Sequence, residues 1–161
     1  MSTTVDAPAD EAVIVMTRMF DAPRPLVWAC MTQPEHMARW WGGPGFTNPV
    51  CEIDLRPGGL WRHVMRAPNG TEYAFDFIYL EVAEPERIVW QNADHGKRKD
   101  GPPTSVVTVT LEDHGTQTRW RMVARFESIA ARDLSVKMGF GQMIDVSNAR
   151  LDAYLKSPEG R

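Results

Sequence analysis

Hydrophobic and polar residues alternate with a period of two along the middle of the chain, which predicts a series of β-strands. The alternation is cleanest between residues 116 and 126, where Trp120 and Met122 lie on one face and Arg119 and Arg121 on the other. Five further runs show this pattern, near residues 47–54, 59–67, 71–83, 86–93 and 104–112. Short turns join them, so we expect an antiparallel meander with one dry face.

The residues before these runs have other patterns. Val13–Phe20 is rich in β-branched residues and predicts a first strand. A short helix is expected from Pro25 onwards, because proline is well suited to the first turn of a helix. A second short helix is expected over Glu35–Trp41, and the glycine- and proline-rich segment that follows ends it.

The C-terminal part of the chain predicts one long amphipathic helix. Apolar residues from Phe140 to Leu155 recur at steps of three and four, while Gln142 and Asp145 lie off that stripe. Both this helix and the dry face of the sheet need an apolar surface to pack on. We therefore predict an α+β fold in which a curved, antiparallel, seven-stranded sheet wraps around the long helix, with the two short helices at one end. The expected division is a flexible tail over residues 1–11, a single domain over 12–156 and a short tail over 157–161.

Composition and charge narrow the function classes. With 161 residues, of which 43% are hydrophobic and 24% charged, the chain is typical of one soluble domain with a sizeable core. Its formal charge of −3 gives no general attraction to nucleic acid or to anionic lipid. No apolar run approaches the roughly 18 residues of a membrane span, and no signal-peptide pattern precedes the first strand. We expect a cytoplasmic protein without membrane insertion.

The sequence lacks the motifs of metal, nucleotide and acyl-enzyme chemistry. Cys30 and Cys51 belong to no CxxC or Cys/His spacing, which argues against a zinc site and a disulfide framework. Neither HExxH, Gly-x-Ser-x-Gly nor a Walker loop is present. We therefore expect no metal and no other cofactor.

An ordered set of motifs runs through nearly the whole chain. They are Arg18 with Phe20-Asp21-Ala22-Pro23, Pro34-Glu35, Trp40-Trp41-Gly42, Asp54-x-Arg56-Pro57-Gly58-Gly59, Pro85-Glu86-Arg87-Ile88, and Gly141 with Leu151–Leu155. With these motifs the chain resembles the START/SRPBCC superfamily, and within it the branch named after the activator of the heat-shock protein 90 ATPase. The resemblance implies the helix-grip fold, whose members bind lipids, hormones, polyketides or chaperones in or around the groove between sheet and long helix. The Gly58-Gly59 pair is expected to be structural, because glycine permits positive φ and close strand approach.

A hollow between the curved sheet and the long helix is the candidate site. Hollows lined by aromatic side chains with a few polar groups bind small ligands. From the alternation we expect the lining to comprise Trp61, His63, Met65, Phe75, Phe77, Tyr79, Trp90, Trp120, Met122, Phe140, Met143, Ile144 and Ser147. The predicted function is binding of a small, largely hydrophobic molecule there, of the lipid or polyketide kind.

A cyclase- or hydrolase-like pocket enzyme is an alternative. His63 lies between two apolar residues on the expected inner face and could act as an acid or a base near neutral pH. Asp76 could do the same, but a one-residue slip of the strand register would move its side chain from the hollow to solvent. Both residues therefore stay candidates.

Partner proteins are the remaining alternative. The resemblance implies a chaperone-associated interaction module. A homodimer is also expected, because Ile78, Leu80 and Val82 give their strand a second apolar face that would otherwise be wet.

Overall fold

The computed structural model describes residues 3–93 and 103–158, which form one antiparallel sheet and four helices. The strands are β1 (Thr4–Asp6), β2 (Val13–Phe20), β3 (Thr47–Ile53), β4 (Leu60–Arg66), β5 (Glu72–Ala83), β6 (Arg87–Asn92), β7 (Ser105–His114) and β8 (Gln117–Phe126). The helices are α1 (Arg24–Thr32), α2 (Pro34–Trp40), α3 (Ile129–Lys137) and α4 (Phe140–Lys156). The strand order is β1-β2-β8-β7-β6-β5-β4-β3.

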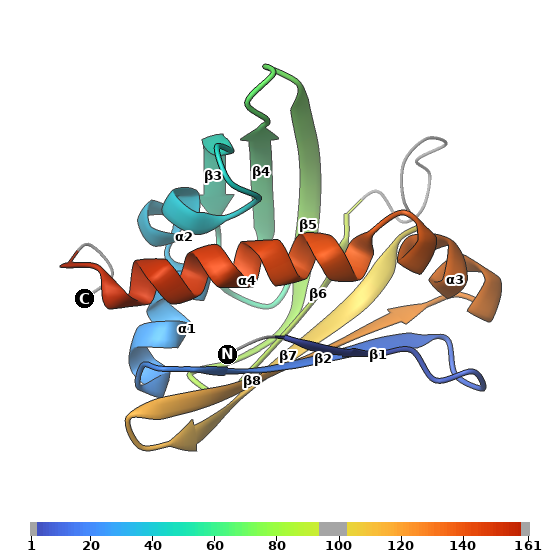
Figure 1. The fold of residues 1–161 in the computed structure, drawn as a ribbon, viewed down its shortest axis with the longest axis horizontal. Helices are drawn as coiled ribbons and strands as arrows, with labels where there is room; N and C mark the ends of the chain where they lie inside the picture. The colour runs from blue at the N-terminus through green and yellow to red at the C-terminus, as the bar shows by residue number, and fades with distance from the viewer. Residues whose placement is uncertain (1–2, 94–102, 159–161) are drawn as a thin grey trace.

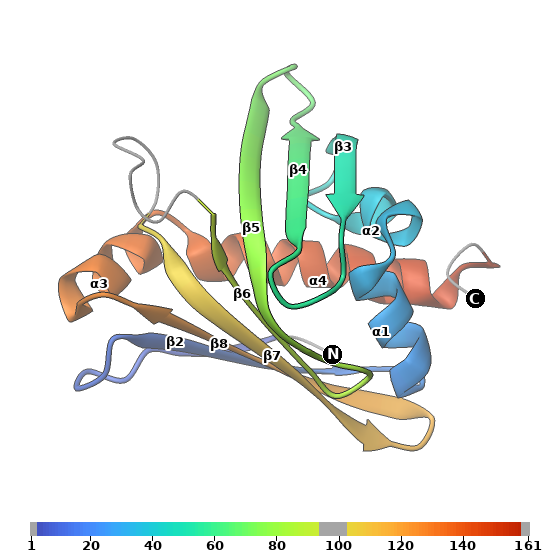
Figure 2. The same cartoon turned by 180° about the vertical axis from the view of Figure 1, so that it is seen from behind.

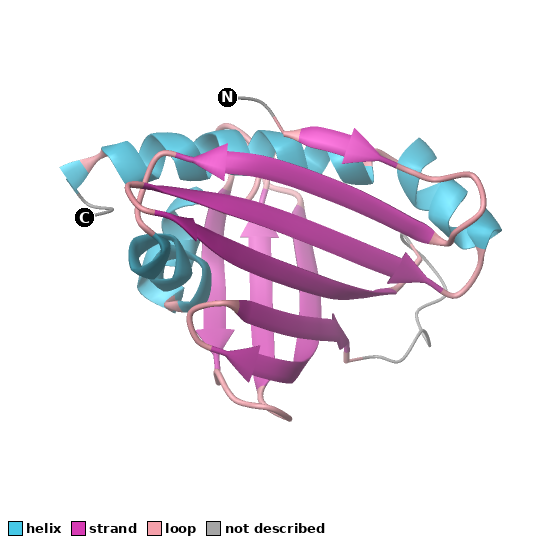
Figure 3. Cartoon of the chain, turned by 90° about the horizontal axis from the view of Figure 1, so that it is seen from below, coloured by secondary structure: helices cyan, strands magenta, loops and turns pink. Residues whose placement is uncertain are grey.

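The sheet curves around α4, which lies along its concave side (Figure 1). Figure 2 shows the convex side, and Figure 3 shows how β3, β4 and β5 turn away from the direction of β2, β7 and β8. Helices α1 and α2 lie at one end of the sheet and α3 at the other. The helix-grip architecture predicted from the sequence is therefore confirmed.

The sheet has eight strands in place of the expected seven, because Thr4–Asp6 pairs with β2. These residues fall in the segment that was predicted to be a flexible tail. One side chain holds the segment that follows β1: the Arg132 guanidinium, which is 3% exposed, donates to the carbonyl oxygens of Pro8, Glu11 and Val13 at 2.7–3.0 Å. Residues 1–2 and 159–161 of the two expected tails lie outside the described residues.

Helix α3 is a further difference, because the sequence predicted only one helix after the strands. Ser128 caps it, with its hydroxyl accepting a hydrogen bond from the Ala131 N–H at 3.0 Å. Its buried residues are Arg132 and Ser135, so the helix lacks the apolar stripe by which helices are predicted. It ends at Lys137, and Gly139, whose φ is 93°, lets the chain change direction into α4.

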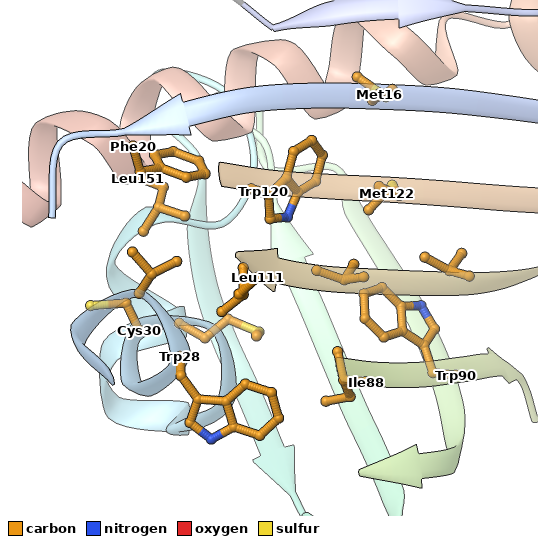
Figure 4. Close-up of a cluster of buried hydrophobic side chains, with 14 of the residues drawn as sticks. Met16, Phe20, Trp28, Cys30, Ile88, Trp90, Leu111, Trp120, Met122 and Leu151 are labelled. Carbon is orange, nitrogen blue, oxygen red and sulfur yellow. The ribbon is translucent and has the colours of Figure 1, made fainter. Parts of the chain in front are cut away.

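The concave face carries the core, as the alternation in β8 predicted. Trp120, Met122, Ala124 and Phe126 are buried. Arg119, Arg121 and Arg125, which point to the other face, are exposed. Figure 4 shows Trp120 and Met122 beside residues of α1, β2, β6 and α4. Because strands such as β2, β4 and β8 bury alternate residues on one face, their register is fixed.

A β-bulge in β5 changes the expected dimer surface. Tyr79 pairs with Trp90 and Glu81 with Val89, which leaves Leu80 as the extra residue. The bulge reverses the alternation, so Val82 packs against the core and does not continue the outward face. The continuous apolar face predicted over Ile78, Leu80 and Val82 is wrong for this reason.

Candidate functional site

Seven aromatic rings on the concave side contact one another and form the aromatic cluster. Its members are Trp41, Trp61, His63, Phe75, Phe77, Tyr79 and Trp90. Trp61 lies at the centre, with ring centroids 4.8 Å from Phe77, 5.1 Å from Trp41 and 5.3 Å from Trp90. These distances and the tilted or edge-on angles are those of favourable aromatic pairs.

The members of the cluster differ in exposure. Trp61, His63 and Tyr79 are each 1% exposed and belong to the interior. Trp41, Phe75 and Phe77 are only half-buried. The cluster therefore has a filled floor and an aromatic edge that solvent reaches.

His63 is held as a neutral ring by two hydrogen bonds. The indole N–H of Trp61 donates to His63 Nδ1 at 3.1 Å. The Nδ1 atom is thus an acceptor, so the proton lies on Nε2, which donates to Asn48 Oδ1 at 2.7 Å. Burial lowers the pKa of His63 from 6.5 to about 4. Both ring nitrogens are occupied, which leaves the imidazole no free position for proton transfer to a ligand.

Asn48 reaches His63 because of a local irregularity in β3. The register between β3 and β4 shifts between Thr47 and Val50, and Pro49 in this stretch has no N–H to pair. The Asn48 amide nitrogen donates to the carbonyl oxygens of Ala38 and Trp41 at 2.9 and 3.1 Å. The side chain thus joins the histidine to the C-terminal end of α2.

Arg150 on α4 holds the same end of α2 from the other side. Its guanidinium donates to the carbonyl oxygens of Arg39, Trp41, Gly42 and Gly43, at distances between 2.8 and 3.3 Å. These carbonyls belong to the last turn of α2 or follow it, where the helix supplies no N–H partner. Burial lowers the pKa of Arg150, but the group stays charged at neutral pH. Arg150 therefore fixes the position of Trp41, the member of the cluster that comes from outside the sheet.

Arg150→Met is expected to lower the free energy of unfolding by about 2 kcal/mol, because a charged donor to several carbonyls is lost while the aliphatic stem is retained. Arg39→Met is the control, since Arg39 is exposed and makes no side-chain hydrogen bond in the described part of the chain; its cost should stay near 0.5 kcal/mol. Urea unfolding followed by circular dichroism measures both. Equal costs for the two variants would contradict the assigned role.

Helix α4 supplies the opposite wall and is held over the sheet by charge. Arg18 on β2 is buried on the concave side, 3.6 Å from Asp145 and 3.7 Å from Asp152 of α4. Phe140 and Ile144 pack against the core and are half-buried. An ion pair beneath the helix and apolar contacts at its N-terminal half together set the distance between helix and sheet.

The structure separates the predicted lining residues into groups. Six belong to the aromatic cluster: Trp61, His63, Phe75, Phe77, Tyr79 and Trp90. Trp120 lies elsewhere on the concave face, edge-on to Phe20 at 6.4 Å (Figure 4), and Met65 and Met122 are buried. On α4, Met143 is 43% exposed, and Ser147 accepts a hydrogen bond from the Gly42 N–H at 3.2 Å.

Three contributors to the site were absent from the predicted lining: Trp41, Asn48 and Arg150. In the sequence, Trp41 stands out only as part of the Trp40-Trp41-Gly42 motif. An Asn-Pro pair at the start of a strand is a signal of irregular backbone, which could have drawn attention to Asn48. Arg150 lies on the polar side of α4, where no pattern distinguishes it from other surface arginines.

Asp76 points to the convex side. It pairs in register with Arg62, and the two side chains form an ion pair at 3.7 Å, both about half exposed. His63 lies on the opposite face of the same two strands. The register question that the sequence left open is thus resolved, and no single point is within reach of both side chains.

Cys51 and Tyr79, which also lie near the cluster, are neutral at pH 7. Burial raises the pKa of the Cys51 thiol to about 11, and the nearby Glu35 carboxylate contributes to the shift. Burial and Cys51 raise the pKa of Tyr79. A thiol with a raised pKa is a poor nucleophile. Within residues 3–93 and 103–158, no group of three His, Cys, Asp or Glu side chains is placed to hold a metal ion.

The convex side carries an open depression of about 270 Å³. It is lined by Glu52, Ile53, Asp54, Leu60 and Arg62. Its walls mix charged and apolar side chains and contain no aromatic ring.

None of the helices that the structure describes is long and apolar enough to cross a membrane.

Comparison with known proteins agrees with this fold. The model of the family described as Activator of Hsp90 ATPase homolog 1-like protein matches residues 21–156. A solved protein from Mycobacterium smegmatis is similar, with 27% identity over 96% of this chain and 97% of its own, at a TM-score of 0.84. A protein from Nitrosomonas europaea has 26% identity over 91% and 96%, at a TM-score of 0.80. A protein from Silicibacter pomeroyi described as AHSA1 shares the fold, with 21% identity over 90% and 98%, at a TM-score of 0.71. No curated protein matches the sequence.

Proposed function

The chain belongs to the Activator of Hsp90 ATPase homolog 1-like family, and on this basis we propose that it binds a small, uncharged, largely apolar molecule against the aromatic cluster. The observation that carries the proposal is the exposed edge of the cluster. Trp41, Phe75 and Phe77 stay half-buried on the concave side, although their rings contact buried neighbours. Aromatic rings left partly open on a concave surface are typical of ligand sites.

The charges around the cluster favour an uncharged ligand. His63, Cys51 and Tyr79 are neutral at pH 7, so none of them compensates a ligand charge. The buried Arg18 is engaged with Asp145 and Asp152. A charged ligand would lose its hydration without gaining a partner, which costs several kcal/mol. A flat or alicyclic apolar molecule loses little hydration energy and gains ring contacts.

A neutral apolar dye, N-phenyl-1-naphthylamine, tests the proposal. Its fluorescence should rise on addition of the protein. Phe77→Ala should weaken binding about ten-fold or more, the usual effect of truncating an aromatic anchor. Leu80→Ala is the control, because Leu80 lies on the same strand and is 45% exposed at the bulge. Equal dye affinity for Phe77→Ala and the unmodified protein, with both folded by circular dichroism, would overturn the proposal.

The positions of His63 and Asp76 favour ligand binding over catalysis as the proposed function. His63 has both nitrogens engaged, and Asp76 lies on the other face of the sheet. A pocket enzyme that uses either residue has no support from these positions.

A chaperone-associated role is a second candidate, favoured by membership of a family described by homology to an Hsp90 ATPase activator. Co-elution of the purified protein with a purified chaperone on a sizing column tests it. Elution of the two proteins in separate peaks at micromolar concentration counts against this role.

A further inference from the structure

Three exposed arginines lie on the convex face of β8. Arg119, Arg121 and Arg125 are exposed, and none of them forms an ion pair or side-chain hydrogen bond within residues 3–93 and 103–158. We refer to them as the β8 arginines. In the register of the sheet they lie opposite Met19, Thr17 and Val13 of β2, and Glu112, Thr110 and Val106 of β7.

The opposing carboxylate is engaged elsewhere. Glu112 lies across from Arg119, but its Oε1 is 2.6 Å from His114 Nε2. Arg121 and Arg125 face threonine and valine side chains, which carry no charge. The β8 arginines therefore form a row of positive charge in which no side chain is ion-paired within residues 3–93 and 103–158.

Three other exposed arginines, which lie between β3 and β5, are paired with carboxylates. Arg62 pairs with Asp76 at 3.7 Å, Arg66 with Glu72 at 2.6 Å, and Arg56 with Asp54 at 2.9 Å. We refer to Arg56, Arg62 and Arg66 as the paired arginines. Cross-strand or local carboxylates thus neutralise the β3–β5 part of the sheet. The contrast with β8 is notable in a chain whose net charge is −3.

We propose that the β8 arginines bind an acidic, extended segment of a partner protein. Alternate residues of a strand are about 7 Å apart, so Arg119 and Arg121 match carboxylates at alternate positions of an extended peptide. Thr110 of β7, which pairs with Arg121, adds a hydroxyl group that can hydrogen-bond to a carboxylate. The charge complementarity favours this occupant.

Nucleic acid fits the face less well. Binding of single strands relies on aromatic side chains on which bases stack. The outward residues of β2, β7 and β8 in the described structure are Val, Thr, Met, Glu, Gln, His and Arg, with no Phe, Tyr or Trp. The net charge of −3 also repels a polyanion that extends beyond the row.

A fluorescein-labelled peptide of alternating serine and glutamate is the probe, measured by anisotropy with the full chain. Binding is expected at about 0.02 M salt and should weaken strongly at about 0.15 M, where charges are screened beyond about 8 Å. Replacing the three β8 arginines by glutamine should weaken binding about ten-fold or more. The matched control replaces the three paired arginines by glutamine, which removes the same charge from the chain and should change the affinity less than about two-fold.

Three results would overturn the proposal. The first is no binding of the peptide at low salt. The second is an equal loss in the β8 and control variants, which would show a response to net charge alone. The third is tighter binding of oligothymidylate than of the peptide, which would assign the face to nucleic acid. Circular dichroism checks that both triple variants are folded. If the triple variant of the β8 arginines does not fold, the single variant Arg121→Gln is measured in its place, and it should lose part of the affinity for the peptide.

Discussion

Gly59→Ala is expected to destabilise the protein by about 4 kcal/mol or more, a large part of the stability of a domain of this size. A Cβ at position 59 would lie 2.0 Å from the carbonyl oxygen of Asp54, far inside van der Waals contact. That oxygen cannot move away freely, because it accepts a hydrogen bond from the Arg56 N–H at 2.9 Å. The Gly59 carbonyl is also fixed, since it accepts from the Tyr79 N–H at 3.0 Å. Urea unfolding, or loss of soluble protein, measures the effect.

Gly58→Ala is the matched control for this prediction. Gly58 has φ +85°, and a Cβ added there would have no other atom within 4 Å, so its substitution carries only the cost of a left-handed backbone, about 1–2 kcal/mol. Glycine is thus required at the two positions for different reasons. Gly58 adopts a positive φ, and Gly59 leaves no space for a Cβ. Similar stabilities for the two alanine variants would contradict this distinction.

The assignment of side chains to faces could be predicted for strands such as β2, β4 and β8, which have one dry face. In β8 the alternation of Trp120 and Met122 with arginines admits a single register. The direction of Asp76 could not be predicted, because apolar residues precede and follow it. Pairing with Arg62 across the sheet decides it, and that partner lies 14 positions away in the sequence, from 62 to 76.

The missed elements depend on polar contacts. Helix α3 buries Arg132 and Ser135, and β1 is a short, exposed strand. Arg132 holds the N-terminal segment through backbone carbonyls, which every residue has, so the sequence of that segment carries no signal. The bulge at Leu80 could not be predicted either, because no glycine or proline occurs there to indicate it. Hydrophobic periodicity therefore predicts most strands and the long helix, but it does not predict β1, α3 or the bulge at Leu80.

The residues of the candidate site also fall into two groups, those that hydrophobic periodicity predicts and those that polar contacts position. Rings supplied by strands, such as Phe77 and Trp90, follow from period-two alternation. Trp41, Asn48 and Arg150 enter the site through loop geometry and carbonyl hydrogen bonds. Their placement depends on how α2 ends against α4, which is a tertiary property. What the alternation predicted was the wall; what it missed was the set of polar contacts that positions the one ring contributed from outside the sheet.

Between pH 6.5 and about pH 4, protonation of His63 is expected to remove up to about 3 kcal/mol of stability. Burial depresses the pKa of this histidine in the folded state, so the unfolded chain binds the proton more readily. The contribution is fully present above pH 6.5 and is lost as the pH falls through the folded-state pKa. A proton on Nδ1 would also displace the hydrogen bond from Trp61 and place a charge among aromatic rings.

The variant His63→Gln isolates this effect, because glutamine stays neutral throughout the range. It should be less stable than the unmodified protein at pH 7, and the difference should shrink toward pH 4. Phe75→Leu is the control, since Phe75 stacks on His63 at 5.3 Å but carries no titratable group, and this variant should keep the full pH dependence. Urea unfolding at pH 7, 5.5 and 4.5 supplies the three curves. Parallel curves for His63→Gln and the unmodified protein would mean that His63 is protonated equally in both states, and that the aromatic cluster does not hold it neutral.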